Sequence, residues 1–277
     1  MRLRIALCNE VLQRMEFSAQ CSFAAALGYD GLEVAPFTLG DAPDELSDRQ
    51  IAAVRRAAEA AGIVVAGLHW LLIRPEGLSL TSAEPAVRAR TVAVMRRMVA
   101  LCAALGGAYL VHGSPAQRRL PQAGQADARG WAADGFAEAG EAASRAGVVY
   151  CVEPLARGET NFINTVAEAA ALVRSIGNPS LRTMLDTSAA AQNEAASAQA
   201  LLAEWLPTGL IAHVQVNDRN RRGPGEGADR FAPVLRTLRE HGYAGWVGVE
   251  PFEYRPDGPA CAARAIGYLR GIEETLG

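Results

Sequence analysis

Short apolar runs recur along the chain, and each is followed by a longer segment in which apolar residues return at helical spacing. The short runs are apolar at nearly every position and rich in β-branched residues, which is typical of parallel strands buried on both faces. The predicted strands cover Leu3–Cys8, Gly31–Ala35, Ile63–Leu68, Ala108–Val111, Gly147–Val152, Leu181–Leu185, Ile211–Val216 and Trp246–Val249.

The segments between these runs predict helices. Gly28, Gly62 and Gly147 directly follow three of them, as expected where a helix ends in a left-handed residue. The predicted helices cover Phe17–Leu27, Ser47–Ala61, Glu84–Leu105, Gln125–Ala146, Thr165–Ile176, Glu194–Trp205, Asp229–His241 and Ala260–Leu276.

Eight strand–helix units follow one another without a break in composition. This alternation predicts an α/β fold, a single (β/α)8 TIM barrel over residues 1–277. The alternative is an open, doubly wound sheet. It is disfavoured because Asn9 and Glu10 follow the first strand, where a nucleotide-binding sheet has a glycine-rich loop.

Carboxylates stand at the ends of three predicted strands. Glu153 and Glu250 each close an apolar run and precede a proline, and Asp186 closes the sixth run. The carboxyl ends of barrel strands meet at one mouth, so these groups would repel each other unless they are protonated or bind a cation. One such acid alone is explained by a salt bridge at the rim. The three together favour a site for a divalent ion such as Mn²⁺ or Mg²⁺.

Composition argues against several classes of function and location. The formal net charge is −3, and no basic cluster suggests binding to nucleic acid. The five cysteines are scattered and contain no C-x-x-C pair, which suits reduced thiols in a cytoplasmic protein. No apolar run approaches the ~20 residues that span a membrane, and the chain starts directly with a strand pattern rather than a signal peptide.

Several segments at the predicted strand ends resemble the ketose 3-epimerases of the xylose isomerase-like TIM-barrel superfamily. The resemblance covers the whole barrel and is sharpest in its second half. The segments are Val152–Leu155, Glu159–Thr165, Met184–Thr187, Asn220–Gly227 and Gly248–Phe252.

The resemblance implies a role for individual residues. Glu153 and Glu250 would be catalytic glutamates that also bind the metal, and Asp186 would be the third ligand. The fourth ligand, a histidine in the ketose epimerases, falls on Gln215, and a glutamine there resembles the hydroxypyruvate isomerase branch. Glu159 and Arg221 match positions that contact the substrate. The implied cofactor is one divalent ion, with Mn²⁺ expected first and Mg²⁺ or Co²⁺ as alternatives.

The expected reaction is proton abstraction next to a carbonyl, through an enediolate, on a small keto sugar or keto acid. Return of the proton would give epimerisation or isomerisation, whereas loss of a β-hydroxyl would give a dehydratase of the inosose or dehydroshikimate type. Gln215, together with Ala189 where the epimerases have a histidine, also leaves open a non-catalytic sugar-binding barrel. A homodimer or homotetramer is expected from the resemblance only.

His69 and His112 close the third and fourth predicted strands. Histidines at these positions resemble metal ligands of the endonuclease IV branch, but Ala189 and Gln215 stand where that branch needs further histidines, so a three-zinc nuclease is rejected. We expect His69 and His112 to hydrogen-bond substrate hydroxyls, with a supporting or core role as the alternative.

Other expectations are a solvated pair for Arg118–Arg119, a hydrogen-bond network or a rim salt bridge for Glu33, and apolar walls or plain packing for Trp70 and Phe252.

Overall fold

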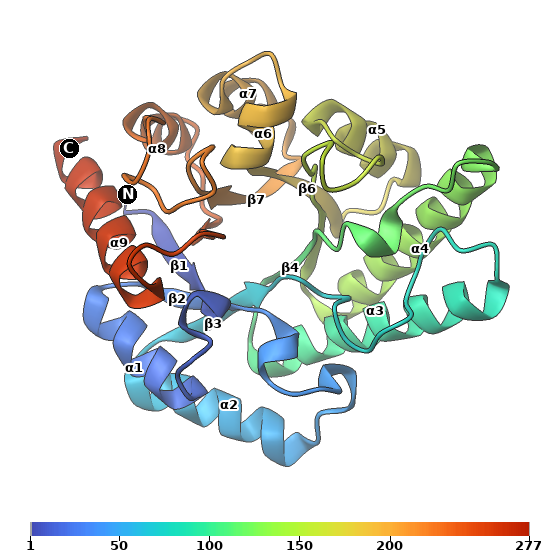
Figure 1. Ribbon diagram of the computed structural model, residues 1–277, viewed down its shortest axis with the longest axis horizontal. Coiled ribbons are helices and arrows are strands. Elements are labelled where there is room, and N and C mark those ends of the chain that lie inside the picture. The colour runs from blue at the N-terminus through green and yellow to red at the C-terminus, as the bar shows by residue number, and fades with distance from the viewer. Residues whose placement is uncertain (1, 277) are drawn as a thin grey trace.

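The computed structural model describes residues 2–276 and contains a closed barrel of eight parallel strands (Figure 1). Each strand pairs with the next along the chain, and β8 pairs with β1 to close the sheet. The predicted fold class is therefore confirmed. Met1 and Gly277 of the predicted domain lie outside the described residues. The strands are β1 (Arg4–Cys8), β2 (Gly31–Val34), β3 (Val64–Leu68), β4 (Tyr109–His112), β5 (Val149–Val152), β6 (Leu181–Asp186), β7 (Ile211–Val216) and β8 (Trp246–Val249).

Helices form a ring around the outside of the barrel (Figure 1). Gly28 and Gly147 end α1 and α4 in the left-handed conformation, with φ of 94° and 69°, as their positions predicted. The helices are α1 (Phe17–Leu27), α2 (Asp48–Ala61), α3 (Pro85–Leu105), α4 (Gln125–Ala146), α5 (Val166–Ile176), α6 (Thr187–Asn193), α7 (Ala198–Trp205), α8 (Ala232–Glu240) and α9 (Gly258–Thr275). Short 3-10 helices add η1 (Asn9–Leu12), η2 (Pro36–Thr38), η3 (Pro43–Glu45), η4 (Ala116–Arg118) and η5 (Leu206–Thr208).

Two of the predicted helix starts were wrong by three residues or more. The helix predicted from Glu194 begins at Ala198, because the Ser197 side chain accepts a hydrogen bond from the Ala200 N–H and caps the helix there. The helix predicted from Asp229 begins at Ala232. The helix α6 was not predicted at all, and it follows β6 without a connecting loop.

Buried apolar side chains fill both sides of the sheet. One large cluster lies between the strands and the surrounding helices, and a smaller one includes Ala6, Ala66, Tyr109, Val111, Cys151, Met184 and Trp246 from the strands. Alternate residues of each strand face the barrel interior, so this second group packs the inside of the barrel. The barrel is therefore a packed core, and space for a ligand is left at its carboxyl end.

Both ends of the described chain lie together beside α9 (Figure 1). The Leu3 N–H donates to the Glu273 carboxylate at 2.7 Å, and Arg270 donates to the Leu3 carbonyl at 3.0 Å. These bonds join the first strand to the last helix and help to close the ring. Across residues 2–276, no helix is both long enough and apolar enough to cross a membrane.

Candidate active site

Three carboxylates converge at the carboxyl end of the barrel. Glu153 follows β5, Asp186 ends β6 and Glu250 follows β8. One oxygen from each lies within 4.8 Å of the others, and the three residues are only 4–6% exposed. They adjoin a pocket of about 300 Å³, its open mouth included, which Glu153 and Glu250 line.

Burial and mutual repulsion make these carboxyls hard to ionise. Burial raises the pKa of Glu250 to about 8 and that of Asp186 to about 7. Burial also raises the pKa of Glu153 well above its usual range, and the charges of Glu250 and Asp186 raise it further. The positive charges of His69 beside Glu250 and of Arg118 near Glu153 oppose these rises without cancelling them.

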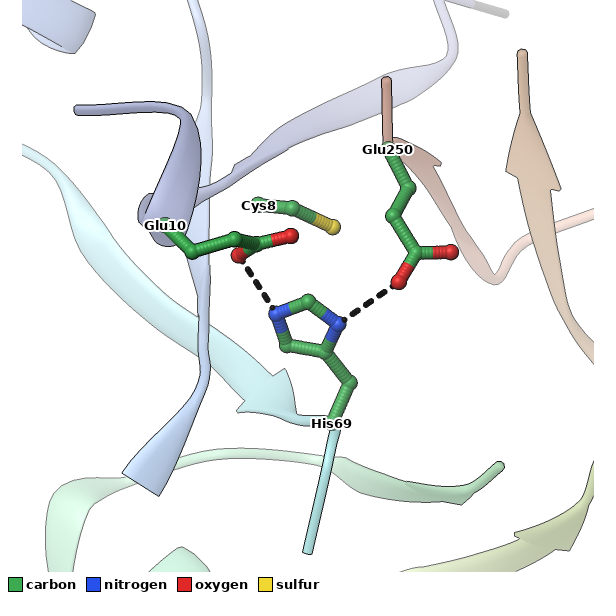
Figure 2. A group of neighbouring side chains, drawn as sticks. All are labelled: Cys8, Glu10, His69 and Glu250. Carbon is green, nitrogen blue, oxygen red and sulfur yellow. Dashed lines mark hydrogen bonds and ion pairs between the residues drawn. The ribbon is translucent and has the colours of Figure 1, made fainter. Parts of the chain in front are cut away.

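His69 and Trp70 hold one oxygen of Glu250. His69 Nδ1 lies 3.1 Å from Glu250 Oε1, and the Trp70 indole N–H donates to the same oxygen at 3.1 Å. The other ring nitrogen of His69 lies 2.9 Å from Glu10 Oε2, so the ring bridges two carboxylates beside Cys8 (Figure 2). Burial opposes a charge on His69, but the Glu10 charge and the hydrogen bonds to Glu10 and Glu250 raise its pKa well above its usual range.

His69 lines the pocket as predicted for a substrate contact, but both of its nitrogens already face carboxylates. This geometry gives it a clear part in orienting Glu250. Trp70 adopts φ of 52°, a left-handed conformation that is costly for an aromatic residue and is a feature of functional sites. Trp70 and Phe252 both line the pocket, with ring centroids 6.5 Å apart, as expected for its apolar walls.

Asn217 holds Asp186 and was missed by the sequence analysis. Its Nδ2 donates to Asp186 Oδ2 at 2.8 Å and to the Glu250 carbonyl at 3.0 Å. The second carboxylate oxygen, Asp186 Oδ1, accepts the Ala189 N–H at 2.7 Å and thereby caps α6. Asn217 directly follows β7, and that position at a strand end is the signal that could have identified it.

The Glu153 backbone is held by a buried arginine. Arg118 donates to the carbonyl of Glu153 at 2.5 Å and to that of His112 at 3.4 Å, and it is fully buried. The prediction of a solvated pair was therefore wrong for Arg118, whereas Arg119 is exposed. Burial lowers the Arg118 pKa to about 10, against the opposing effect of the Glu153 charge.

Gly113 leaves room for the Glu153 side chain. A Cβ at this position would lie 2.4 Å from Glu153 Oε2, which is closer than atoms can pack. Among the described residues, no donor is hydrogen-bonded to the Glu153 carboxylate. Glu153 thus has a fixed backbone and an uncommitted carboxylate at the pocket wall.

Gln215 lies in β7 beside the carboxylates. Strand register pairs it with Asp186 on one side and with Gly248, two residues before Glu250, on the other. Its Nε2 donates to Glu33 Oε1 at 2.9 Å, whereas its Oε1 is buried and has no hydrogen-bond partner among residues 2–276. A buried amide oxygen without a donor is costly unless a ligand completes it.

Glu33 is the centre of a buried network rather than part of a rim salt bridge. Its Oε2 accepts the Tyr109 hydroxyl at 2.8 Å and lies 3.0 Å from His213 Nε2, while its Oε1 accepts Gln215. Burial would raise the pKa of Glu33, but the charge and hydrogen bond of His213 outweigh burial and lower it. Glu33 therefore carries a negative charge within the barrel.

The two residues predicted to contact the substrate at the rim lie next to each other. Arg221 Nη1 is 3.6 Å from Glu159 Oε1, and its guanidinium lies 4.6 Å from the centroid of the Phe252 ring. Arg221 adopts φ of 67°, and its carbonyl accepts the N–H groups of Phe252 and Glu253. These bonds hold the loop after β7 against the loop after β8 at the pocket mouth.

His112 lies away from the pocket. Its Nδ1 is 2.7 Å from the Tyr150 hydroxyl, and its ring packs edge-on against Phe136 of α4, so it occupies the layer between barrel and helices. Burial lowers its pKa well below the usual range. The fold therefore gathers the other predicted site residues around one mouth and leaves His112 behind the strands, so its predicted contact with substrate has no support in this geometry.

Comparisons with known proteins agree with this architecture. The family model described as "Xylose isomerase-like TIM barrel" matches residues 21–272. A D-psicose 3-epimerase of Agrobacterium fabrum is 30% identical over 244 residues, covering 86% of this chain and 80% of the relative. A putative hydroxypyruvate isomerase of Mus musculus is 31% identical over 118 residues, 42% of this chain and 40% of the relative.

The fold is also similar to that of solved structures. A structure of L-ribulose 3-epimerase superposes with a TM-score of 0.84 at 24% identity and covers 99% of this chain and 96% of its own. With the family match over most of its length, a closed eight-stranded barrel and acidic residues at the strand ends, the chain belongs to the xylose isomerase-like TIM-barrel family.

Proposed function

We propose that the protein is a divalent-metal-dependent isomerase or epimerase that acts on a small keto sugar or keto acid. The observation that carries the proposal is the convergence of Glu153, Asp186 and Glu250 beside the pocket. The family membership and the named epimerase and isomerase relatives support the same class of enzyme.

The residues at the mouth fit a divalent cation. Glu153, Asp186, Glu250 and Gln215 would hold it, and all four offer the oxygen atoms that Mn²⁺ and Mg²⁺ prefer. Two of these atoms, Gln215 Oε1 and Glu250 Oε2, are buried and have no partner in the described part of the chain. When bound, the cation supplies charge compensation for the carboxylates and polarises a carbonyl oxygen.

The chain's own residues would carry the proton. The Glu250 carboxylate is oriented through Oε1 by His69 and Trp70, which leaves Oε2 without a protein donor. The Glu153 carboxylate stands on another strand end with no hydrogen-bond donor among the described residues. One glutamate would remove the proton next to the carbonyl, and the other, from a different strand end, would return it.

The walls of the pocket would shield this step from water and orient the substrate. Trp70, Leu155 and Phe252 supply apolar surface, and Glu159 with Arg221 supplies polar groups at the rim. The pocket is small and combines apolar walls with a few polar groups, which suits a small sugar or keto acid.

A keto-acid isomerase is the second candidate within this proposal. Gln215 favours it, since the resemblance to hydroxypyruvate isomerases includes a glutamine at the fourth ligand position. Ketose epimerisation is favoured by a relative that matches 86% of the chain, a D-psicose 3-epimerase. The two differ in substrate and share the same first step.

The deciding experiment is solvent exchange in deuterium oxide with added Mn²⁺. We expect the protein to incorporate deuterium next to the carbonyl of one member of a panel of ketoses and hydroxypyruvate, followed by mass spectrometry and NMR. The position of the label in the product separates epimerisation from isomerisation. A protein that binds Mn²⁺ but catalyses no exchange on any member of the panel contradicts the proposal.

A further inference from the structure

The side-chain amide of Gln215 ends in an oxygen and an NH₂ group of similar size, and only the oxygen can bind a cation. Rotation by a half-turn would put the NH₂ group where the oxygen stands. A glutamine is therefore a sound metal ligand only if its surroundings select one orientation. In β7 the side chain is fully buried, so that selection must come from a neighbouring protein group.

The neighbour that selects the orientation is Glu33. Its Oε1 accepts Gln215 Nε2 at 2.9 Å, and both residues are fully buried. A rotated amide would set its oxygen against the carboxylate oxygen, placing two acceptors together away from water. Such an unpaired, repulsive contact is costly in a dry interior.

The Glu33 carboxylate is itself fixed. Tyr109 and His213 both approach its other oxygen, Oε2, and their rings stack with centroids 4.1 Å apart. This leaves Oε1 for Gln215. On the β8 side, a Cβ at Gly248 would lie 2.4 Å from Glu33 Oε2 and 3.2 Å from Gln215 Cγ, so a glycine is needed for the pair to reach each other.

We infer that Glu33 is a positioning residue that fixes the amide of Gln215 with its oxygen free to act as a metal ligand. This inference rests on the metal-dependent function proposed above. A competing account is that Glu33 acts only through its negative charge, which attracts a cation whatever the orientation of the amide. The two accounts make opposite predictions for two conservative substitutions.

Glu33→Gln removes the negative charge and keeps the length of the side chain. The introduced amide oxygen still accepts Gln215 Nε2. The introduced NH₂ faces the Tyr109 hydroxyl, which can turn to accept it, and His213, which accepts it once the ring is neutral. Glu33→Asp keeps the charge but is one bond shorter and loses contact with Gln215. We expect Glu33→Asp to weaken Mn²⁺ binding by roughly 10–100-fold, the usual effect of losing a group that orients a ligand, and Glu33→Gln to bind Mn²⁺ close to the wild-type affinity.

The dissociation constant for Mn²⁺ is measured by calorimetric titration of each full-length protein, after thermal unfolding of the metal-free form has shown that it folds. Tyr150→Phe is the matched control, because it also removes a buried strand hydroxyl, but one that contacts His112 behind the strands and not Glu33; its Mn²⁺ affinity should stay near that of the wild type. In a Gln215→Ala background, Glu33→Asp should cause no further loss, since its effect acts through the amide.

Weakened binding in Glu33→Gln, unchanged binding in Glu33→Asp, or an additive loss in the double variant each overturns the inference. The Glu33→Gln result is decisive even if Glu33→Asp does not fold, because the charge account requires a loss there. Failure of the wild-type protein to bind Mn²⁺ would instead refute the proposed function. Wild-type binding with no effect of Glu33→Asp would refute only the role of Glu33.

Discussion

At the scale of single residues, the two glutamates that close β5 and β8 are held in different ways. Glu250 has one oxygen fixed by His69 and Trp70, which binds it into a chain of polar groups reaching Glu10. Glu153 is fixed through its backbone by Arg118, and its carboxylate has no protein donor in residues 2–276. The site therefore pairs one rigid carboxylate with one that is free to adjust to the substrate.

This difference predicts how the two glutamates respond to substitution. Glu153→Gln and Glu250→Gln should each lower the rate of solvent exchange by about 10²–10⁴-fold, the usual contribution of an acid–base group. Metal-free Glu153→Gln should melt no lower than the wild type, because no hydrogen bond to its carboxylate is lost and repulsion is relieved. Metal-free Glu250→Gln should melt lower than Glu153→Gln, because its contact with His69 is weakened.

The measurements are deuterium exchange with Mn²⁺ and thermal unfolding without metal. Glu204→Gln, on the exposed face of α7, is the control for both. Substantial exchange by either site variant would contradict the two-glutamate mechanism.

At the scale of elements, the site depends on short links between neighbouring strand ends. Arg118 in η4 joins the end of β4 to the end of β5 by its bonds to the carbonyls of His112 and Glu153. Asn217 joins β7 to α6 and to the end of β8. The segments after β4 and β7 are thereby held by the ends of neighbouring strands, as expected where a barrel must position groups from several strands.

Neighbouring arginines provide a matched test of the link between β4 and β5. Arg118→Leu should lower the free energy of unfolding by about 2–3 kcal/mol, because it leaves two buried carbonyls without their charged donor. Arg119→Leu should change it by no more than about 0.5 kcal/mol, because Arg119 is exposed. Urea unfolding monitored by circular dichroism gives both values, and equal effects of the two substitutions would show that the buried link is not stabilising.

The periodicity of hydrophobic residues predicted the strand order and the ring of helices. It did not identify the side chains that fix the carboxylates in place. Arg118 and Arg119 are adjacent residues of the same type, so the sequence does not distinguish them. The course of the loop in three dimensions buries Arg118 and leaves Arg119 exposed. The helix α6 was missed because Asp186 was considered as a metal ligand alone, whereas one of its oxygens also caps that helix. His112 ends its strand, as predicted, yet the alternation of side chains turns it toward Phe136 of α4.

At the scale of the whole molecule, a packed barrel holds at one end three buried carboxylates that nearby positive charge compensates only in part. The apolar residues inside the barrel and the closed sheet fix the strand ends, so the carboxylates of β5, β6 and β8 cannot move far apart. Stability of the fold and occupancy of the site are therefore linked, since anything that binds only the folded state stabilises it.

This link predicts how stability depends on pH. Asp186 and Glu250 have folded pKa values of about 7 and about 8, above the ordinary values of 3.8 and 4.5. The folded, metal-free protein thus binds protons more tightly than the unfolded chain. The stability that these two groups contribute is complete below their ordinary values and is lost as the pH rises through the folded values, a window from about pH 4 to about pH 8.

Mn²⁺ should prevent this loss of stability at higher pH, because a cation favours the ionised carboxylates and offsets their repulsion. We expect the melting temperature of the metal-free protein to fall between about pH 5 and about pH 8, and that of the protein with saturating Mn²⁺ to change much less. Glu153→Gln removes one of the repelling groups and should flatten the metal-free curve. Calorimetric scans after treatment with EDTA test this, and a metal-free curve that rises with pH, or that matches the Mn²⁺ curve, would show that the carboxylates are compensated within the protein.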